Sequence, residues 1–306
     1  EWLEIFHLLK EREFLKEHLI LLYKVFHERC AELVFNLDEL GYSEWQSCSP
    51  KNVIVSTSID PSNVYHSVKC SLTHMSLLVC ISLAGDSLTP MLITKHPISE
   101  KFFEDGLRQD EDVSLRQRNP PYMSSELFQE FIELTFIPYV QDIRKKLNKK
   151  KEPAILMMDS CRAHCSEKVL EILGKNNIIV YTFPSHTSNL FQPCDLSQFG
   201  TLKTIQKSMK RETNQDKIKD YIMRILKAYE SAATSFNIRG SFRKAGLYIC
   251  TTHKPYTIKY DSFTLKKNPG FQILWNLNIK KEELSARRLN QKFGIINIDY
   301  LPKNCP

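Results

Sequence analysis

The alternation of apolar and polar blocks along this chain predicts a mixed α/β fold. Short, nearly uninterrupted apolar runs at 32–38, 154–159 and 178–183 are typical of buried strands. Residues 76–93 hold two further apolar runs separated by a Gly-Asp pair, which is the pattern of a β-hairpin. We therefore expect these segments to supply the strands of a sheet.

Apolar residues at three- and four-residue spacing predict helices around these runs. The longest such pattern covers 123–148, where Pro138 predicts a kink or break because proline has no amide hydrogen to donate. Further helices are expected over 1–30, 165–175, about 197–211 and about 215–235. Residues 98–121 are polar and contain proline, so we expect an exposed connection. This order of elements predicts a mixed sheet with helices on its faces.

The composition is that of an ordinary globular protein without a membrane span. Of the 306 residues, 42% are hydrophobic and 25% are charged. No apolar run reaches the roughly 18 residues that a membrane helix needs. A net charge of +7 permits a polyanionic partner without demanding one. The chain begins without methionine, so we expect it to be part of a longer protein.

The nine cysteines favour a reduced, intracellular compartment, because their number is odd and no C-x-x-C pair occurs. A zinc site built from Cys161, His164, Cys165 and Cys194 would match no standard structural spacing. We favour the interpretation that these thiols are small buried side chains.

Three aspartates stand at the ends or starts of predicted elements. Asp38 and Asp159 each follow an apolar strand pattern, and Asp195 precedes a predicted helix. Each one alone is typical of a turn or a helix cap. If the two strands are neighbours, however, their carboxylates meet at one edge of the sheet, and the helix adds a third. Such carboxylates repel one another, and Mg²⁺ or Mn²⁺ would remove the conflict.

Basic residues follow the third aspartate. Lys203, Lys207 and Arg211 recur every four residues on one predicted helix face, with Lys210 beside them. This pattern is typical of a solvated basic face, and it is equally the pattern of a track for a nucleic-acid backbone. The basic run at 145–153 is open to the same two interpretations, a solvated linker or a nuclear-import or phosphate contact.

Five short blocks occur in an order that resembles a known family. They are NLDELG (36–41), MMDSCRAH (157–164), PSHTSNLFQPCD (184–195), FGTLK (199–203) and FRKAG (242–246). In these blocks the chain is similar to the DDE/DDD transposase superfamily, and within it to the mariner-like pogo, Tigger and jerky branch, which includes centromere protein B. The resemblance spans about residues 1–255.

The resemblance implies a fold, a chemistry and a set of partners. The fold would be a ribonuclease H-like mixed sheet flanked by helices. The metal-binding and catalytic triad would be Asp38, Asp159 and Asp195, with Mg²⁺ or Mn²⁺ as cofactor. His164 would lie behind the metal ligands, and Arg162 would meet a phosphate. The substrate would be DNA in the nucleus, cleaved by hydrolysis and then joined by strand transfer, in a homodimer or a higher synaptic assembly.

The expected domain division is an N-terminal helical linker at 1–30, a catalytic domain at 31–255 and an extension without an assigned role at 256–306. Two other functions stay open. One is a domesticated DNA-binding or chromatin protein that keeps the fold without catalysis. The other is a ribonuclease H-like nuclease directed at RNA. Retention of the three aspartates favours the nuclease, because clustered carboxylates destabilise a protein that holds no metal.

Overall fold

The computed structural model describes residues 29–42, 74–104, 106–161, 163–183, 188–210, 216–250 and 257–259. Nearly all of the predicted N-terminal helix at 1–30 and of the extension at 256–306 lies outside these ranges. Arg162 and Arg211 also lie outside them. No helix in the described ranges combines the length and the apolar character that crossing a membrane requires.

Six strands form one mixed sheet in the order β4-β3-β2-β1-β5-β6. Their bounds are Val34–Tyr42 (β1), Met75–Ser82 (β2), Met91–Thr94 (β3), Ser114–Gln117 (β4), Ala154–Met158 (β5) and Ile178–Thr182 (β6). The β1-β2 and β2-β3 pairs are antiparallel, whereas β4 runs parallel to β3, β5 to β1 and β6 to β5. The hairpin predicted within 76–93 is thus confirmed as β2 and β3. A separate pair joins β7 (Tyr248–Cys250) to β8 (Thr257–Lys259).

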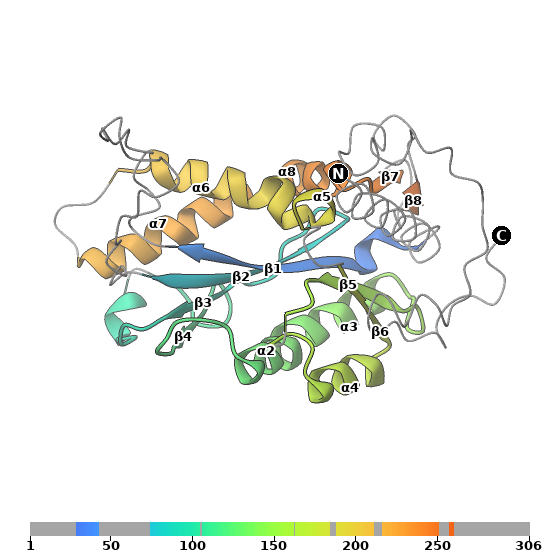
Figure 1. The fold of residues 1–306 in the computed structure, drawn as a ribbon, viewed down its shortest axis with the longest axis horizontal. Coiled ribbons are helices and arrows are strands. Elements are labelled where there is room, and N and C mark those ends of the chain that lie inside the picture. The colour runs from blue at the N-terminus through green and yellow to red at the C-terminus, as the bar shows by residue number, and fades with distance from the viewer. Residues whose placement is uncertain are drawn as a thin grey trace, which may run out of the picture.

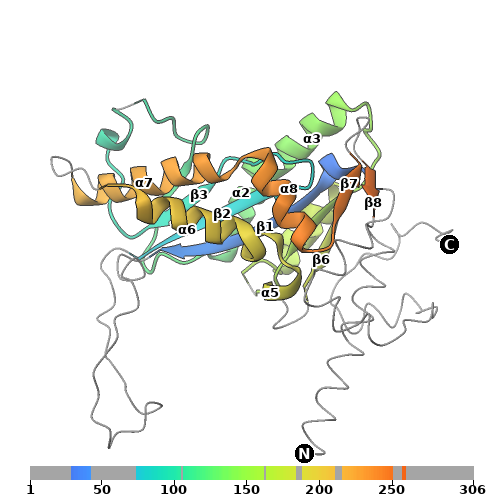
Figure 2. The ribbon, with the colours of Figure 1, turned by 90° about the horizontal axis from the view of Figure 1, so that it is seen from above.

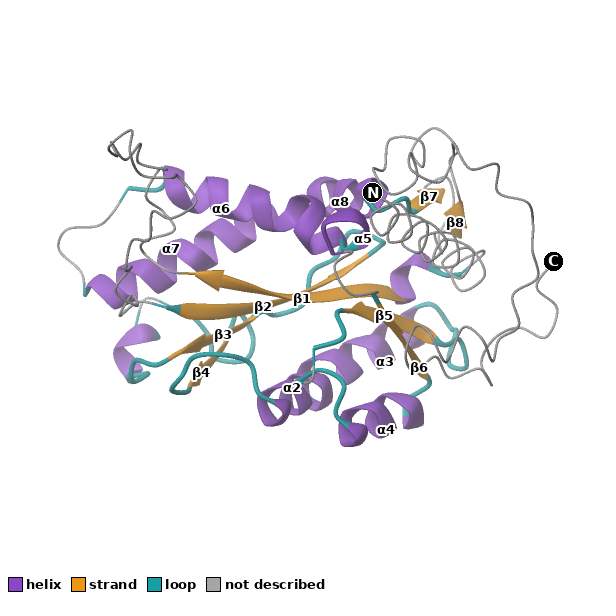
Figure 3. Cartoon of the chain, viewed as in Figure 1, coloured by secondary structure: helices purple, strands orange, loops and turns teal. Residues whose placement is uncertain are grey.

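Helices cover both faces of the sheet (Figure 1). One layer contains α2 (Ser125–Phe131), α3 (Ile137–Lys146) and α4 (Glu167–Lys175). The other contains α5 (Ser188–Phe191), α6 (Phe199–Ser208), α7 (Lys217–Ala232) and α8 (Ser235–Lys244). Figure 2 shows the second layer from above, and Figure 3 shows the helices on either side of the strands. The predicted mixed α/β class is therefore confirmed.

Each layer has its own hydrophobic core, and β1 contributes to both. Phe35 and Leu37 pack in the core with α2, α3 and α4. Val34 and Leu40 pack in the core with α6, α7 and α8. Because side chains alternate along a strand, the even-numbered residues of this stretch face the α5–α8 layer and the odd-numbered ones face the α2–α4 layer. This alternation decides where the polar residues of β1 point.

Short irregular elements shape the ends of the regular ones. They are the 3-10 turns η1 (Ala31–Leu33) and η4 (Glu100–Phe102), and the π-helical stretch η5 (Ile132–Phe136) between α2 and α3. The helix does not break at Pro138: helical backbone runs from Ser125 to Lys146, with η5 ending just before the proline, which lies in the first turn of α3. A second π-helical stretch, η6 (Cys194–Gln198), precedes α6.

Three predicted boundaries are wrong. The strand of Asp38 continues to Tyr42, because Leu40 and Tyr42 are buried and pair with β2. The exposed connection at 98–121 contains β4, whose Leu115 is buried against the core. The helix expected to reach residue 211 ends at Ser208, since Met209 adopts an extended backbone.

Candidate functional site

Neighbouring strands bring Asp38 and Asp159 to the same part of the sheet. In the parallel β1-β5 pair, Asn36 lies opposite Met157. Continuing this register by two positions sets Asp38 beside Asp159, the residue that follows β5. Parallel neighbours are about 4.8 Å apart. Asp38 is only 9% exposed and its carboxylate accepts a hydrogen bond of 2.8 Å from the backbone N–H of Glu39. Asp159 is half-buried.

A buried amide connects these two strands to the segment of Asp195. Asn36 is wholly buried; its Nδ2 donates to the carbonyl of Met157 at 3.1 Å, and its Oδ1 accepts from the N–H of Cys194 at 2.9 Å. Asn36 lies two residues before Asp38 and therefore on the same face of β1. One side chain thus ties β1, β5 and η6 together, and it places Asp195, the residue after Cys194, at the same edge.

The interpretation of Asp195 as a helix cap is wrong. The residue lies inside η6, whose N-cap position is Pro193, and no side chain caps that helix start. Ser197, also inside η6, accepts a hydrogen bond of 3.1 Å from Nζ of Lys244.

The three carboxylates interact electrostatically. Burial raises the pKa of Asp38 well above its usual range, and the charges of Asp195 and Asp159 raise it further. The pKa of Asp195 is also raised. The main cause is partial desolvation of its carboxylate, although the residue as a whole is exposed. The charge of Lys203 lowers this pKa, and the charge of Asp159 raises it. These interactions show that segments distant in sequence bring the three aspartates near one another.

The aspartates do not, however, form a single tight cluster. Among the described residues, one group of three potential metal-ligating side chains has its ligand atoms all within 4.8 Å of one another. This group is Asp159, Cys161 and His164. Asp38 and Asp195 are therefore spread around Asp159 rather than gathered with it on one point. The charges of Asp195 and Asp159 both act on Asp38, and that of Asp159 also acts on Asp195, so each of the three aspartates interacts with the other two.

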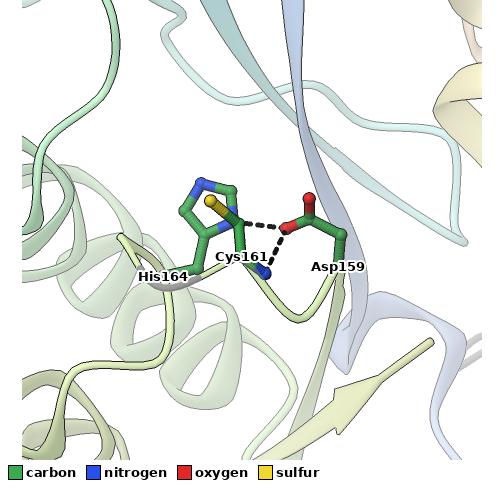
Figure 4. A group of neighbouring side chains, drawn as sticks. All are labelled: Asp159, Cys161 and His164. Atoms are coloured by element: carbon green, nitrogen blue, oxygen red, sulfur yellow. Dashed lines mark hydrogen bonds and ion pairs between the residues drawn. The ribbon is translucent and has the colours of Figure 1, made fainter. Parts of the chain in front are cut away.

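His164 connects Asp159 to Glu39. Its Nδ1 lies 2.6 Å from Oδ1 of Asp159 and its Nε2 lies 2.8 Å from Oε1 of Glu39 (Figure 4 shows the first contact). The ring is 2% exposed and stacks on Phe128 with 4.4 Å between ring centroids. Burial alone would lower the pKa of His164, but the two carboxylates outweigh it and raise that pKa to about 10. The imidazole is therefore a cation that lowers the pKa of Asp159 below its usual range.

The role of Glu39 was not predicted. Strand alternation places Glu39 on the face opposite Asp38, toward α2 and α4. The sequence shows this orientation, but not that the loop after β5 brings His164 to the same face from 125 positions away.

A pH dependence follows from His164. Because its folded-state pKa is raised above the usual histidine value of 6.5, the charged ring stabilises the fold fully below pH 6.5, and this stabilisation is lost as pH rises through about 10. We expect the unfolding temperature of the metal-free protein to fall over this window. His164→Gln should flatten the fall, as thermal unfolding followed by circular dichroism at a series of pH values would show. An unchanged slope in the variant would contradict this assignment.

The basic face is shorter than predicted. Lys203 is half-buried and close enough to Asp195 to lower its pKa, and Lys207 is exposed one turn further along α6. Lys210 is exposed but lies beyond the end of the helix, so it does not continue this face. Contact of these lysines with nucleic acid stays a prediction.

The fold and these acidic positions define the chain as an α/β domain with a carboxylate-lined sheet edge. Residues 72–242 match the model of the family described as DDE superfamily endonuclease, and the chain belongs to this family. The match includes Asp159 and Asp195, whereas Asp38 precedes it.

Individual relatives are more distant. The MFS-type transporter clz9 of Cochliobolus lunatus is 28% identical over 180 residues, which are 56% of this chain and 19% of that protein. The chain thus spans about a fifth of the length of this curated relative. The structure described as the Mos1 mariner paired end complex with Mn is 15% identical, with a TM-score of 0.48 over 78% of this chain and 59% of that chain. The Mos1 transposase catalytic domain with Raltegravir and Mg is 14% identical, with a TM-score of 0.46 over 76% and 87% of the two chains.

Proposed function

We propose that this chain is a transposase-type DNA endonuclease domain in which Asp38, Asp159 and Asp195 hold Mg²⁺ or Mn²⁺. The observation that carries the proposal is the approach of three carboxylates from β1, the end of β5 and η6, with the pKa of Asp38 raised by both others. Membership of the endonuclease family supports the same reaction class. Strand transfer after cleavage, a nuclear location and a homodimer or higher assembly on DNA belong to the same proposal.

The donor atoms fit such ions. Carboxylate oxygens are the ligands that Mg²⁺ and Mn²⁺ prefer. Burial is the main cause of the raised pKa of Asp38 and of Asp195, and the repulsion from neighbouring aspartates that adds to it is the condition that bound cations relieve. The spread of the three carboxylates suits a pair of ions, which in such sites lie about 3.5–4 Å apart.

The residues of the chain supply positioning and charge. When bound, two divalent ions stabilise the attacking and leaving oxygens of an in-line phosphoryl displacement. Asn36 holds the segment of Asp195 against β1 and β5. The N–H of Glu39 holds the Asp38 carboxylate, and His164 fixes the Asp159 carboxylate from behind. Lys203 and Lys207 lie on the helix that follows Asp195, where they would attract the phosphates of the substrate backbone.

Nicking of supercoiled plasmid DNA by the purified chain tests the proposal. Cleavage should require Mg²⁺ or Mn²⁺ and should disappear in Asp159→Ala. Equal residual cleavage by wild type and variant would sink it, because that activity would come from a contaminant.

The same preparation tests the non-catalytic alternative. A domesticated DNA-binding protein would bind DNA with a steep salt dependence and would take up no Mg²⁺ in isothermal titration calorimetry. Comparing duplex DNA with an RNA–DNA hybrid as substrate separates the DNA endonuclease from an RNA-directed nuclease.

A further inference from the structure

Cys161 lies beside the proposed catalytic edge without a role in it. The residue is exposed, although the sequence favoured a buried thiol. Figure 4 shows its sulfur next to the ring of His164 and the carboxylate of Asp159. One ligand atom from each of these three side chains lies within 4.8 Å of the other two.

The loop after β5 holds this group in shape through its backbone. The N–H of Cys161 donates to Oδ1 of Asp159 at 3.4 Å. The carbonyl of Cys161 accepts from the N–H groups of His164 and Cys165 at 3.0 and 3.2 Å. The three side chains thus belong to one short segment whose backbone hydrogen bonds help to hold them together.

The set of ligands differs in kind from that of the proposed magnesium site. One thiolate sulfur, one imidazole nitrogen and one carboxylate oxygen are the donors that Zn²⁺ binds, whereas Mg²⁺ avoids sulfur. Three protein ligands with a fourth position open to water form the pattern of an accessible zinc site. Cys161 is exposed, so solvent has a route to that position.

A second contact points to the same ligand. Histidines that bind a metal through one ring nitrogen commonly donate the other N–H to a carboxylate, which fixes the tautomer. Nε2 of His164 lies 2.8 Å from Oε1 of Glu39, so Nδ1 is the nitrogen that faces Asp159. Phe128, stacked on the ring, fixes its plane.

We propose that Asp159, Cys161 and His164 form a binding site for Zn²⁺. The ion takes the place of the proton between Nδ1 and Asp159, and the thiol of Cys161 loses its proton as the S–Zn bond forms. Both protons pass to solvent, and Nε2–H stays on Glu39. The Nδ1–Oδ1 distance of 2.6 Å has to open. Tetrahedral zinc with bonds of about 2.0–2.1 Å needs about 3.3 Å between ligand atoms, so the side chains move apart by less than about 1 Å.

The site would make Zn²⁺ an inhibitor of cleavage, because Asp159 cannot serve both sites at once. This consequence rests on the proposed function, whereas the binding of Zn²⁺ does not.

Titration of the metal-free chain with Co²⁺, an optical substitute for zinc, tests the binding. We expect a thiolate-to-cobalt charge-transfer band that added Zn²⁺ removes. Cys161→Ser should lose this band, and Cys165→Ser, a half-buried thiol in the same turn, should keep it. Because the chain has nine cysteines, the difference between the two variants is what assigns the band to the thiolate of Cys161. Glu39→Gln should keep the band and bind about 10-fold more weakly or worse.

Absence of the band in wild type, or its survival in Cys161→Ser, would overturn the zinc site. Circular dichroism of each variant checks that the fold is retained. The inhibition has a separate readout, which is Mg²⁺-dependent nicking with added Zn²⁺. Cys161→Ser should resist zinc at least about 10-fold better than wild type. A protein that binds Co²⁺ through Cys161 but never cleaves DNA would leave the zinc site standing and remove only the proposed function.

Discussion

Asp38→Asn should abolish metal-dependent DNA cleavage and at the same time stabilise the metal-free protein. Loss of one of the three proposed carboxylate ligands should lower the cleavage rate about a thousandfold or more, which corresponds to about 4 kcal/mol of transition-state stabilisation. The amide oxygen of asparagine can still accept the hydrogen bond from the N–H of Glu39. The fold should therefore survive the substitution.

The stability effect has a defined sign. The folded-state pKa of Asp38 is raised by burial and by its acidic neighbours, so the ionised carboxylate opposes folding. Stability from this group is present below its unfolded pKa and is lost as pH rises through the folded pKa. Asp38→Asn should raise the unfolding temperature at pH 8 and change it little at pH 4.

The response to metal supplies the matching control. Mg²⁺ should raise the unfolding temperature of wild type and should have little effect on Asp38→Asn. Asp142→Asn removes the same charge from an exposed position on α3, where the aspartate pairs with Lys146. This control should keep cleavage and the response to Mg²⁺, with stability changed by about 0.5 kcal/mol or less. If Asp38→Asn responds to Mg²⁺ as wild type does, Asp38 is not a ligand.

Asn36→Leu should disconnect Asp195 from the strands that carry the other two aspartates. The substitution keeps the branching at Cγ but removes both hydrogen bonds of a wholly buried amide, one to Met157 and one from Cys194. Removal of these buried bonds should lower the free energy of unfolding by about 2–4 kcal/mol, as urea denaturation would measure. Cleavage should fall by more than the unfolded fraction explains, because η6 loses its link to β1 and β5.

Ser76→Ala separates positioning from stability. Ser76 donates a buried hydrogen bond of 2.8 Å to the carbonyl of Pro121, on the same sheet but away from η6. Its loss should cost about 1 kcal/mol and leave cleavage intact at temperatures where the protein is folded. If both variants cleave equally well when folded, Asn36 is only a structural residue and the positioning role is wrong.

Local patterns predicted most of the regular structure. The apolar runs at 154–159 and 178–183 became β5 and β6 within a residue, because a buried strand needs little beyond its own apolar side chains. The predictions failed where pairing with a neighbouring strand decides whether a segment forms a strand. Residues 39–42 look like the start of a turn, yet they extend β1 because each of them pairs with a residue of β2, continuing the pairing that begins at Phe35. Ser114–Gln117 is too short and polar to stand out, and it is a strand because β3 lies beside it.

The sequence by itself determined the candidate metal-binding residues, since the spacing of Asp38, Asp159 and Asp195 within recognisable blocks is a property of the chain alone. Only the tertiary structure decided how they are held. The bonds of Asn36 to Met157 and Cys194 and the contact of His164 with Glu39 join residues more than 120 positions apart. Local propensity carries no information about such pairs, because they form only when the sheet and its two helical layers close together.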